Sequence, residues 1–207
     1  MMRIYAIVAA AVLIAGIGGL WLSTLFASED GQFAQCSTAT IAGGSAQIGG
    51  PFELVNDKGQ TVTDKDVLTA PSLIYFGYTY CPDVCPMDTA RNAEAVDLLL
   101  EKGYEINPVF ITVDPARDTP EVVGDFAANL HERMIGLTGS PEQVKAASQA
   151  YKTYYKIHPA EDEFYLVDHS TFTYLMLPEI GFAGLFRRED SAETIAETTA
   201  CLIDATS

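Results

Sequence analysis

Basic residues are scarce in this chain. Of its 207 residues, 12 are Lys or Arg and 28 are Asp or Glu, so the formal net charge is −16 at pH 7. Such an acidic surface repels a phosphate backbone, which argues against nucleic-acid binding. The charge either keeps the chain soluble or matches a basic docking surface on a protein partner, and composition does not choose between the two.

The composition also lacks the bias of a disordered chain or a fibrous repeat. Hydrophobic residues make up 48% of the sequence, and a chain of this length can bury one sizeable core. We therefore expect one globular domain with an accessory segment.

Charged residues are absent from the segment between Ile4 and Phe26. As a helix this segment would span about 35 Å, enough to cross a hydrocarbon core of about 30 Å. Arg3 precedes the segment, and Glu29 and Asp30 follow it. The positive-inside rule then places residues 1–3 in the cytoplasm and the chain after Phe26 outside. The sequence predicts a transmembrane helix at residues 4–26.

A cleaved signal peptide is the alternative interpretation of residues 4–26. The apolar run is longer than a usual signal-peptide core, and no clear A-x-A cleavage site follows it, so an uncleaved signal anchor is favoured. No Arg-rich, acid-poor presequence precedes the run. This pattern fits a single-pass protein of the bacterial inner membrane, with its C-terminal domain in the periplasm.

Residues 27–47 are rich in small and polar residues without periodicity, which predicts a tether, and residues 48–207 are expected to form the folded domain. Two short extended runs flank residues 56–59 and predict a β-hairpin. Strand and helix patterns then alternate. Strands are expected within 71–78, 108–114, 133–139, 163–177 (two, with a polar break at 168–170) and 182–188, and helices from Pro86, from Thr119 and Pro120, from Ser140 to about Tyr151, and after Ser191.

This order of elements predicts an α/β fold, with a central mixed sheet covered on both faces. It is typical of a thioredoxin-like fold with an N-terminal β-hairpin extension, here preceded by one predicted transmembrane helix.

Cys81 and Cys85 lie three residues apart in "YCPDVCP", after a strongly apolar strand pattern and before a predicted helix. On a helix or tight turn both sulfurs can face one point, and the amino-terminal end of a helix favours thiolate over thiol. Three interpretations remain: a structural disulfide, a redox-active dithiol, or two ligands of a metal site. Redox motifs are more often C-x-x-C, and a metal site needs a third ligand.

Histidine could supply that ligand. His131 ends a predicted helix and His158 lies in an acidic stretch, and we expect both to be ordinary satisfied or solvated side chains. His169, in the polar break between two strands, could return to the cysteines. Two thiolates and one imidazole suit Cu(I) and can also hold Cu(II), whereas structural zinc would want a fourth ligand that is not evident. The ligand set therefore favours copper.

Five blocks of the sequence closely resemble the Sco/SenC family of copper-binding, thioredoxin-like proteins that help to assemble cytochrome c oxidase. They are "IGGPFELV", "YFGYTYCPDVCP", "ITVDPARDTP", "GLTGS" and "YLVDHSTFTYLM", which span most of Ile48 to Met176. The resemblance implies that Cys81, Cys85 and His169 are copper ligands. It also implies a thioredoxin core with an added N-terminal hairpin, tethered by one transmembrane helix.

The same resemblance implies a membrane-anchored periplasmic copper chaperone that delivers copper to the binuclear copper site of cytochrome c oxidase subunit II. Its dithiol must be reduced before copper binds, which calls for a periplasmic thioredoxin-like reductant, alongside an upstream copper donor. One alternative is a thiol-disulfide oxidoreductase that reduces the cysteines of that site, with Cys81 as the attacking thiol. Another is a copper or redox sensor. A role as metallochaperone rather than enzyme is favoured.

Asp114, Arg117 and Asp118 in "VDPARDTP" follow the neighbouring strand. They could hydrogen-bond to the ligands, either orienting His169 or tuning the thiolate charge. The alternative is a loop-closing Arg-Asp pair followed by a helix start. Met87 could be a soft axial ligand, but we expect it to pack on the core.

Cys36 in the predicted tether and Cys201 in the last predicted helix do not belong to the motif. Outside the cytoplasm, an even remaining pair of cysteines suggests a structural disulfide between them.

Overall fold

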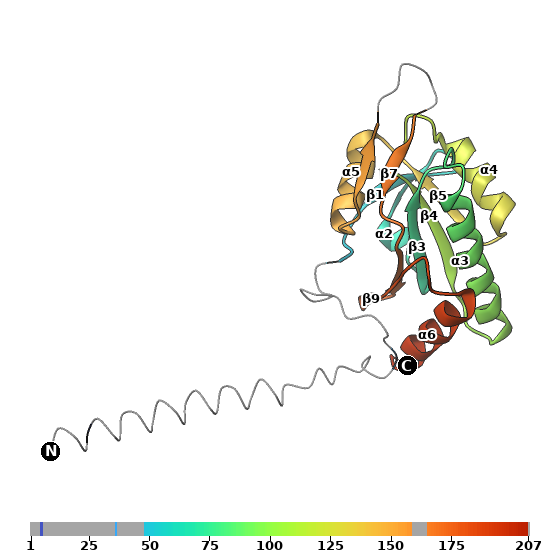
Figure 1. The fold of residues 1–207 in the computed structure, drawn as a ribbon, viewed down its shortest axis with the longest axis vertical. Helices are drawn as coiled ribbons and strands as arrows, with labels where there is room; N and C mark the ends of the chain where they lie inside the picture. The colour runs from blue at the N-terminus through green and yellow to red at the C-terminus, as the bar shows by residue number, and fades with distance from the viewer. Residues whose placement is uncertain (1–4, 6–35, 37–47, 159–164, 207) are drawn as a thin grey trace. The chain divides into compact units, whose positions relative to one another are not determined.

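The computed structural model describes residues 5, 36, 48–158 and 165–206 (Figure 1). The chain divides into two units, Met1–Gln35 and Cys36–Ser207. Nearly all of the predicted transmembrane segment 4–26 and of the predicted tether 27–47 lies outside the described residues. Among the helices that the structure does describe, none is long and apolar enough to cross a membrane.

A seven-stranded mixed sheet forms the centre of the second unit (Figure 1). Its strand order is β2-β1-β5-β4-β3-β8-β9, in which β3, β4 and β5 are parallel and the other pairs are antiparallel. The strands are β1 (Glu53–Asn56), β2 (Thr61–Thr63), β3 (Ser72–Gly77), β4 (Asn107–Thr112), β5 (Ile135–Thr138), β8 (Thr173–Leu177) and β9 (Gly181–Phe186). This is the predicted thioredoxin-like α/β fold, and β1 and β2 are the predicted N-terminal hairpin.

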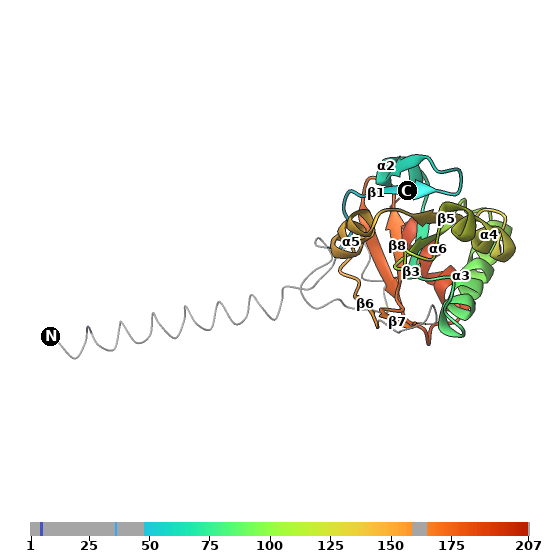
Figure 2. The same cartoon turned by 90° about the horizontal axis from the view of Figure 1, so that it is seen from above.

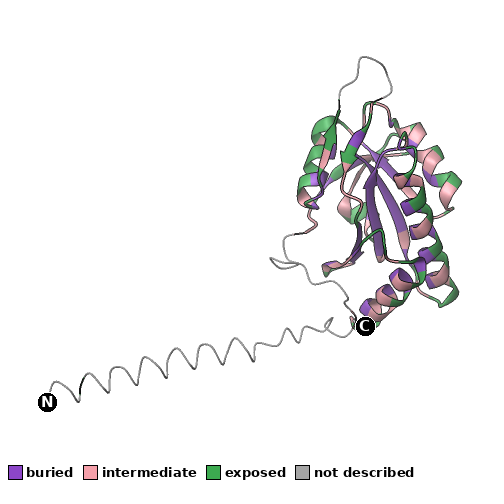
Figure 3. Ribbon diagram, viewed as in Figure 1, coloured by how far each residue is buried: buried purple, intermediate pink, exposed green. Residues whose placement is uncertain are grey.

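Helices cover both faces of this sheet. Figure 2 places α3 and α4 on one side and α5 on the other. All six residues of β3 are buried, as expected for a central strand covered on both faces, and Figure 3 shows the buried strands at the centre. The helices are α2 (Asp64–Val67), α3 (Val84–Glu101), α4 (Pro120–Leu130), α5 (Pro141–Ala150) and α6 (Ala192–Asp204).

Side-chain caps fix where three of these helices begin. The side chains of Thr119, Ser140 and Ser191 each accept a hydrogen bond from a backbone N–H in the first turn of α4, α5 and α6. Thr119 and Ser140 are each followed by a proline, which is favoured at the first helical position. These three helix starts were predicted from the sequence and are confirmed.

Other local predictions were wrong. Helix α3 begins at Val84 rather than Pro86, so Cys85 lies in its first turn. His169 ends a strand, β7 (Val167–His169), instead of lying in a polar break. Strand β7 pairs with an unpredicted strand, β6 (Tyr155–Ile157), in a separate two-stranded sheet. Strand β6 has only three residues and is largely exposed, and α2 has only four, so neither segment shows a clear apolar periodicity.

Candidate metal centre

The two cysteines lie where the central strand β3 passes into helix α3. Strand β3 ends at Gly77, and the loop that follows brings Cys81 back so that its N–H donates to the Tyr78 carbonyl at 3.2 Å. One helical turn later, the N–H of Cys85 donates to Cys81 Sγ at 3.4 Å. Because β3 is central and parallel to β4, this is the carboxyl edge of the sheet, where open α/β folds bind their ligands.

Gly77 makes room for the Cys85 sulfur. A Cβ atom at this position would lie 2.9 Å from Cys85 Sγ, 2.9 Å from a ring carbon of Tyr75 and 3.0 Å from a ring carbon of Phe110. Such distances are below normal van der Waals contact, so no other residue fits without displacing these groups. The last residue of the strand must be glycine for the sulfur to sit against it.

His169 approaches the cysteines from the end of β7. Its Nε2 atom lies 3.2 Å from Cys85 Sγ, and its Nδ1 atom lies 2.9 Å from the Ser170 carbonyl oxygen. A carbonyl only accepts, so Nδ1 carries the proton and Nε2 offers its lone pair to the sulfur side. The rings of Tyr75 and Tyr78 meet the imidazole edge-on, at centroid distances of 6.1 and 5.7 Å. These contacts fix the orientation of the ring.

The three predicted ligands therefore come together. The Cys81 and Cys85 sulfurs and a His169 ring nitrogen all lie within 4.8 Å of one another, and both cysteines are free thiols. The other two histidines are occupied elsewhere: His131 Nε2 contacts Asp97 at 3.1 Å, and His158 Nε2 contacts Asp168 at 2.6 Å. In the part of the chain that the structure describes, this is the one cluster of three such side chains with metal-site spacing.

The two sulfurs have opposite electrostatic environments. Hydrogen bonds from the Cys85 thiol and from the backbone N–H groups of Cys85, Asp83 and Val84 lower the pKa of Cys81 from 9.0 to about 4. The pKa of Cys85 is raised, first because its thiol is the donor to Cys81 and second because it is buried. Cys81 is 9% exposed and Cys85 is 0% exposed. The surroundings thus favour the thiolate form of Cys81 and the neutral thiol of Cys85, and both side chains are buried.

A buried polar chain that the sequence did not reveal lies beneath the cysteines. The Tyr75 hydroxyl donates to Asp88 Oδ2 at 3.1 Å, and burial raises the pKa of Tyr75. Asp88 is 4% exposed and lies 3.7 Å from Arg91 Nη1 and 3.4 Å from Arg188 Nε. The buried carboxylate is thereby paired, as buried charges require. An acidic residue three positions after Cys85, near the start of a predicted helix, was the signal available in the sequence.

Asp114, Arg117 and Asp118 lie in the loop after β4, close to the cysteine loop. The hydrogen bonds of Asp118 go to Thr79 and Thr112, and Asp114 pairs with Arg117. The loop therefore contains the Asp114–Arg117 pair, and helix α4 starts two residues after Asp118. The described partner of His169 Nδ1 is the Ser170 carbonyl, not one of these side chains.

Met87 is 60% exposed, so the expectation that it packs on the core was wrong. It projects from the first turn of α3, two residues after Cys85. The buried face of α3 includes Cys85, Asp88, Thr89 and Asn92, and at 3.6 residues per turn position 87 lies away from that face.

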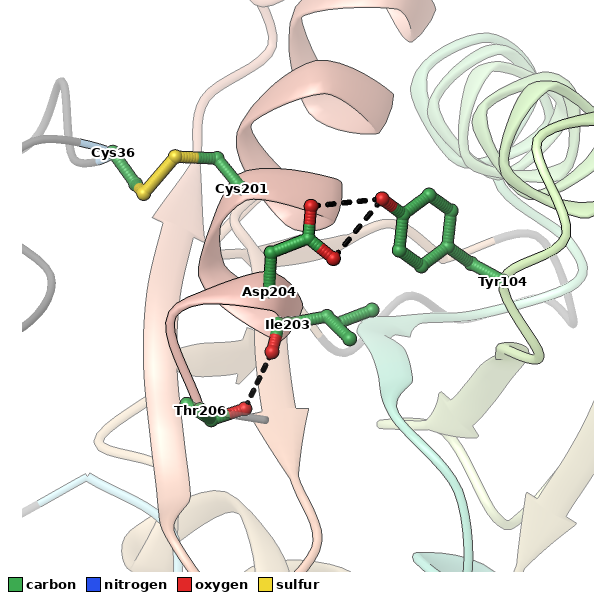
Figure 4. The surroundings of a disulfide bond; sticks show 6 residues. All are labelled: Cys36, Tyr104, Cys201, Ile203, Asp204 and Thr206. Atoms are coloured by element: carbon green, nitrogen blue, oxygen red, sulfur yellow. Dashed lines mark hydrogen bonds between the residues drawn. A yellow bond between two sulfur atoms is a disulfide. The ribbon is translucent and has the colours of Figure 1, made fainter.

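The remaining two cysteines form a disulfide far along the chain from the metal centre (Figure 4). The bond joins Cys36 to Cys201 in helix α6, with their Cα atoms 5.6 Å apart. Close by, the Tyr104 hydroxyl donates to the Asp204 carboxylate at 3.0 and 3.1 Å, which ties α6 to the segment before β4. The two cysteine pairs of the chain thus differ chemically, since one is a disulfide and the other is two free cysteines.

Several known proteins are similar to this chain over most of its length. Protein SenC of Rhodobacter capsulatus is 52% identical over 200 residues, which cover 97% of this chain and 89% of that protein. The crystal structure of Arabidopsis thaliana ScoI with copper bound superposes with a TM-score of 0.73 at 40% identity, over 76% of this chain and 98% of that one. A structure of BsSco, described as a member of the Sco family of cytochrome c oxidase assembly proteins, has a TM-score of 0.59 at 23% identity, over 74% and 92% of the two chains, and supports the fold.

The family model for SCO1/SenC matches residues 41–204, which include the cysteine loop, the histidine and every strand and helix of the described domain. With the fold, the ligand cluster and these relatives in agreement, the chain belongs to the SCO1/SenC family.

Proposed function

We propose that this protein binds copper through Cys81, Cys85 and His169 and carries it to cytochrome c oxidase during assembly of the enzyme. The observation that carries the proposal is the meeting of two thiol sulfurs and one imidazole nitrogen within 4.8 Å at the carboxyl edge of the sheet. A relative at 40% identity is described with copper bound.

The donor atoms suit copper. Thiolate is a soft ligand that selects Cu(I), and imidazole accepts both copper oxidation states, so the set can hold Cu(I) and also Cu(II). The Nε2 atom of His169 has a free lone pair because Nδ1 donates its proton to the Ser170 carbonyl. The pKa of Cys81 is lowered and that of Cys85 is raised, so the proton that copper binding displaces comes mainly from Cys85.

The proposal includes the membrane layout inferred from the sequence. Residues 1–3 would lie in the cytoplasm, 4–26 would anchor the protein, 27–47 would be the tether and 48–207 the copper-binding domain in the periplasm. In that oxidising compartment a thioredoxin-like reductant must keep Cys81 and Cys85 reduced, and an upstream donor must supply copper.

The target of delivery is the binuclear copper site of oxidase subunit II. Transfer would proceed in a docked complex by exchange of one soft ligand at a time, so that copper is never released to water. Cys81 is the more exposed of the two cysteines, and its pKa is lowered. It is therefore the protein ligand best placed to be exchanged first.

A second function, thiol-disulfide exchange, is favoured by the asymmetry of the two thiols. The Cys81 thiolate would attack a disulfide of the target and expel one target thiolate, forming a mixed disulfide. Cys85, after losing its proton, would attack Cys81 and expel the second thiolate. The target would gain two electrons, and Cys81 and Cys85 would be left joined as a disulfide.

Anaerobic titration of the reduced full-length chain with Cu(I) tests the first function. We expect stoichiometric binding by the wild type and by His131→Ala, whose imidazole contacts Asp97 outside the site, and weakened binding by His169→Ala. Absence of stoichiometric binding by the wild type would overturn the carrier function.

The histidine also separates the two functions. Dithiol exchange needs only the two sulfurs, so His169→Ala should keep it while losing copper. If cells that carry His169→Ala still assemble active oxidase, copper delivery by this site is not the essential function, and thiol reduction takes its place.

A further inference from the structure

The loop after β4, residues 114–118, contacts both parts of the metal centre without contributing a ligand. Cys81 comes from the β3–α3 connection, Cys85 from the first turn of α3, and the histidine from the separate β6–β7 sheet. These two parts belong to different sheets, so something other than a shared ladder must set the distance between the sulfurs and the imidazole. We call residues 114–118 the clamp loop.

One arm of the clamp loop reaches the cysteine side. Asp118 is fully buried, and its carboxylate accepts hydrogen bonds from the Thr79 hydroxyl at 2.6 Å and the Thr79 N–H at 3.0 Å. A third bond, from the Thr112 hydroxyl at 2.6 Å, anchors the carboxylate to the end of β4. Thr79 lies two residues before Cys81, in the turn that the Cys81 N–H closes onto the Tyr78 carbonyl. The position of Cys81 therefore depends on the hydrogen bonds that Thr79 donates to Asp118.

The other arm reaches the histidine side. The Tyr165 hydroxyl donates to Asp114 Oδ1 at 2.7 Å, and the Arg117 guanidinium lies 3.6 Å from the centre of the Tyr165 ring. Asp114 is fully buried and also pairs with Arg117. Tyr165 lies two residues before the start of β7 at Val167, and β7 ends at His169. Holding Tyr165 therefore holds the strand that delivers the imidazole.

The two arms have a direct connection. The Arg117 guanidinium also lies over the ring of Tyr80, at 4.8 Å, and of Tyr78, at 5.7 Å, so one cation is shared between the cysteine loop and the histidine strand. Tyr78 in turn accepts a hydrogen bond from the Val167 N–H at 3.5 Å and meets the His169 ring edge-on. Interactions of this kind are strong where they are buried and charge-assisted.

We propose that the clamp loop positions the copper ligands through two arms, Asp118 on Thr79 for Cys81 and Asp114 on Tyr165 for His169. Its residues are positioning residues, because none of them is one of the ligands. The inference rests on the proposed copper function for its affinity readout, and the same geometry predicts effects in the metal-free chain.

The copper test uses the reduced full-length chain and a competing Cu(I) chelator. Thr79→Val keeps the N–H but removes the hydroxyl, and we expect it to weaken copper binding by about 10–100-fold, the usual effect of losing a group that orients a ligand. Thr79→Ser restores the hydroxyl and should restore affinity. Ser148→Ala is the matched control, because it removes a buried hydroxyl bond to the Thr153 carbonyl, of 2.9 Å, on helix α5. It should lower thermal stability and leave affinity unchanged.

A double-mutant cycle tests the second arm. Tyr165→Phe should weaken copper binding in the wild-type background and have no further effect in His169→Ala, because it acts through the imidazole. Thr79→Val should still weaken what binding remains in His169→Ala. The clamp would be overturned if Tyr165→Phe weakened copper binding equally in the wild type and in His169→Ala. It would also be overturned if Thr79→Val and Ser148→Ala had the same copper affinity.

Metal-free measurements keep this inference separate from the copper function. Thr79→Val should change the alkylation rate of Cys81, and Tyr165→Phe should shift the NMR signals of the His169 ring, whereas Ser148→Ala should change neither. If the wild type binds no copper but these shifts occur, the proposed function fails and the clamp stands. If copper binds and neither shift occurs, the clamp fails alone.

Discussion

The Nε2 atom of His169 lies 3.2 Å from the sulfur of Cys85, although 84 residues separate them in the sequence. Because Nδ1 of the same ring donates to the Ser170 carbonyl, the lone pair of Nε2 faces the sulfur. Cys85 is fully buried, so protein groups replace water around its thiol: this imidazole, Cys81, the backbone of Tyr78 and the Tyr75 hydroxyl. The contact closes a three-ligand centre whose parts can bind a metal ion without a large movement of the backbone.

Gly77→Ala should disturb the packing of β3 against the Cys85 sulfur. Its added methyl group would lie 2.9 Å from Cys85 Sγ and would also overlap the buried rings of Tyr75 and Phe110. We expect a loss of about 1–3 kcal/mol in the free energy of unfolding, as for other overpacked cores, together with weaker copper binding. Urea denaturation and Cu(I) titration measure the two effects.

Gly184→Ala is the matched control for that substitution. It also places a methyl group on a strand of the main sheet, but the nearest atom, Leu202 Cδ1, would be 3.4 Å away, an ordinary contact. Copper affinity should be unchanged. A Gly77→Ala protein that binds copper as tightly as Gly184→Ala would contradict the close packing of sulfur against the strand.

The acidity of Cys81 should depend on the thiol of Cys85. The largest contribution that lowers the pKa of Cys81 to about 4 is the hydrogen bond from Cys85. Alkylation of the metal-free chain should therefore show Cys81 reacting as a thiolate from about pH 4 upward, while Cys85 stays unreactive. Cys85→Ala should move the reactivity profile of Cys81 toward its ordinary value of 9.0, and Cys85→Ser, which keeps a hydroxyl donor, should move it less.

This shift has a consequence for stability. The folded-state pKa of Cys81 lies below the unfolded value, so its contribution is fully present above about pH 9 and is lost as pH falls toward about 4. Cys81→Ser should therefore lower the free energy of unfolding more at pH 8 than at pH 4, measured by denaturation without metal. An equal loss of unfolding free energy at both pH values would contradict a thiolate at Cys81.

Tyr75→Phe should cost more stability than its conservative size suggests. The substitution removes the hydroxyl that donates to Asp88 at 3.1 Å and leaves a carboxylate that is 4% exposed with one partner fewer. We expect a loss of about 1–3 kcal/mol in urea denaturation. Tyr104→Phe is a close control, since it also removes a bond to an aspartate, Asp204, but at the exposed surface. Equal losses in the two variants would show that burial of Asp88 is not what matters.

Much of the centre could be predicted from the sequence because its signals are local. The apolar run of β3 marks a central strand, Cys81 and Cys85 follow it directly, and Thr119 and Ser140 announce the next helices through their caps. Cysteine and histidine are also rare in this chain, which has four of the first and three of the second, so few ligand sets built from them were possible. The chemistry of copper then selected among them.

The features that could not be predicted from the sequence depend on contacts between distant segments. Strand β6 is exposed and short, so nothing in its pattern announced that Tyr155 pairs with His169 and that the histidine belongs to a strand. The bond between Tyr165 and Asp114 joins residues 51 positions apart, and a lone tyrosine before a strand gives no sign of it. Met87 is exposed because it lies away from the buried face of α3, a phase that the single apolar side chain near the helix start did not indicate.

The disulfide between Cys36 and Cys201 should stabilise the fold without affecting the copper site. It closes a loop with a sequence separation of 165, and loop-closure entropy alone would contribute up to about 5 kcal/mol, with typical measured values of about 2–4 kcal/mol. The double variant Cys36→Ser/Cys201→Ser should therefore unfold at a lower urea concentration than the wild type. Its Cu(I) affinity should match the wild type, because both sulfurs of the metal centre are unchanged free thiols. Mass spectrometry of the non-reduced wild type supplies the control, since free thiols at both positions there would mean that the bond is absent and that the stability difference has another cause.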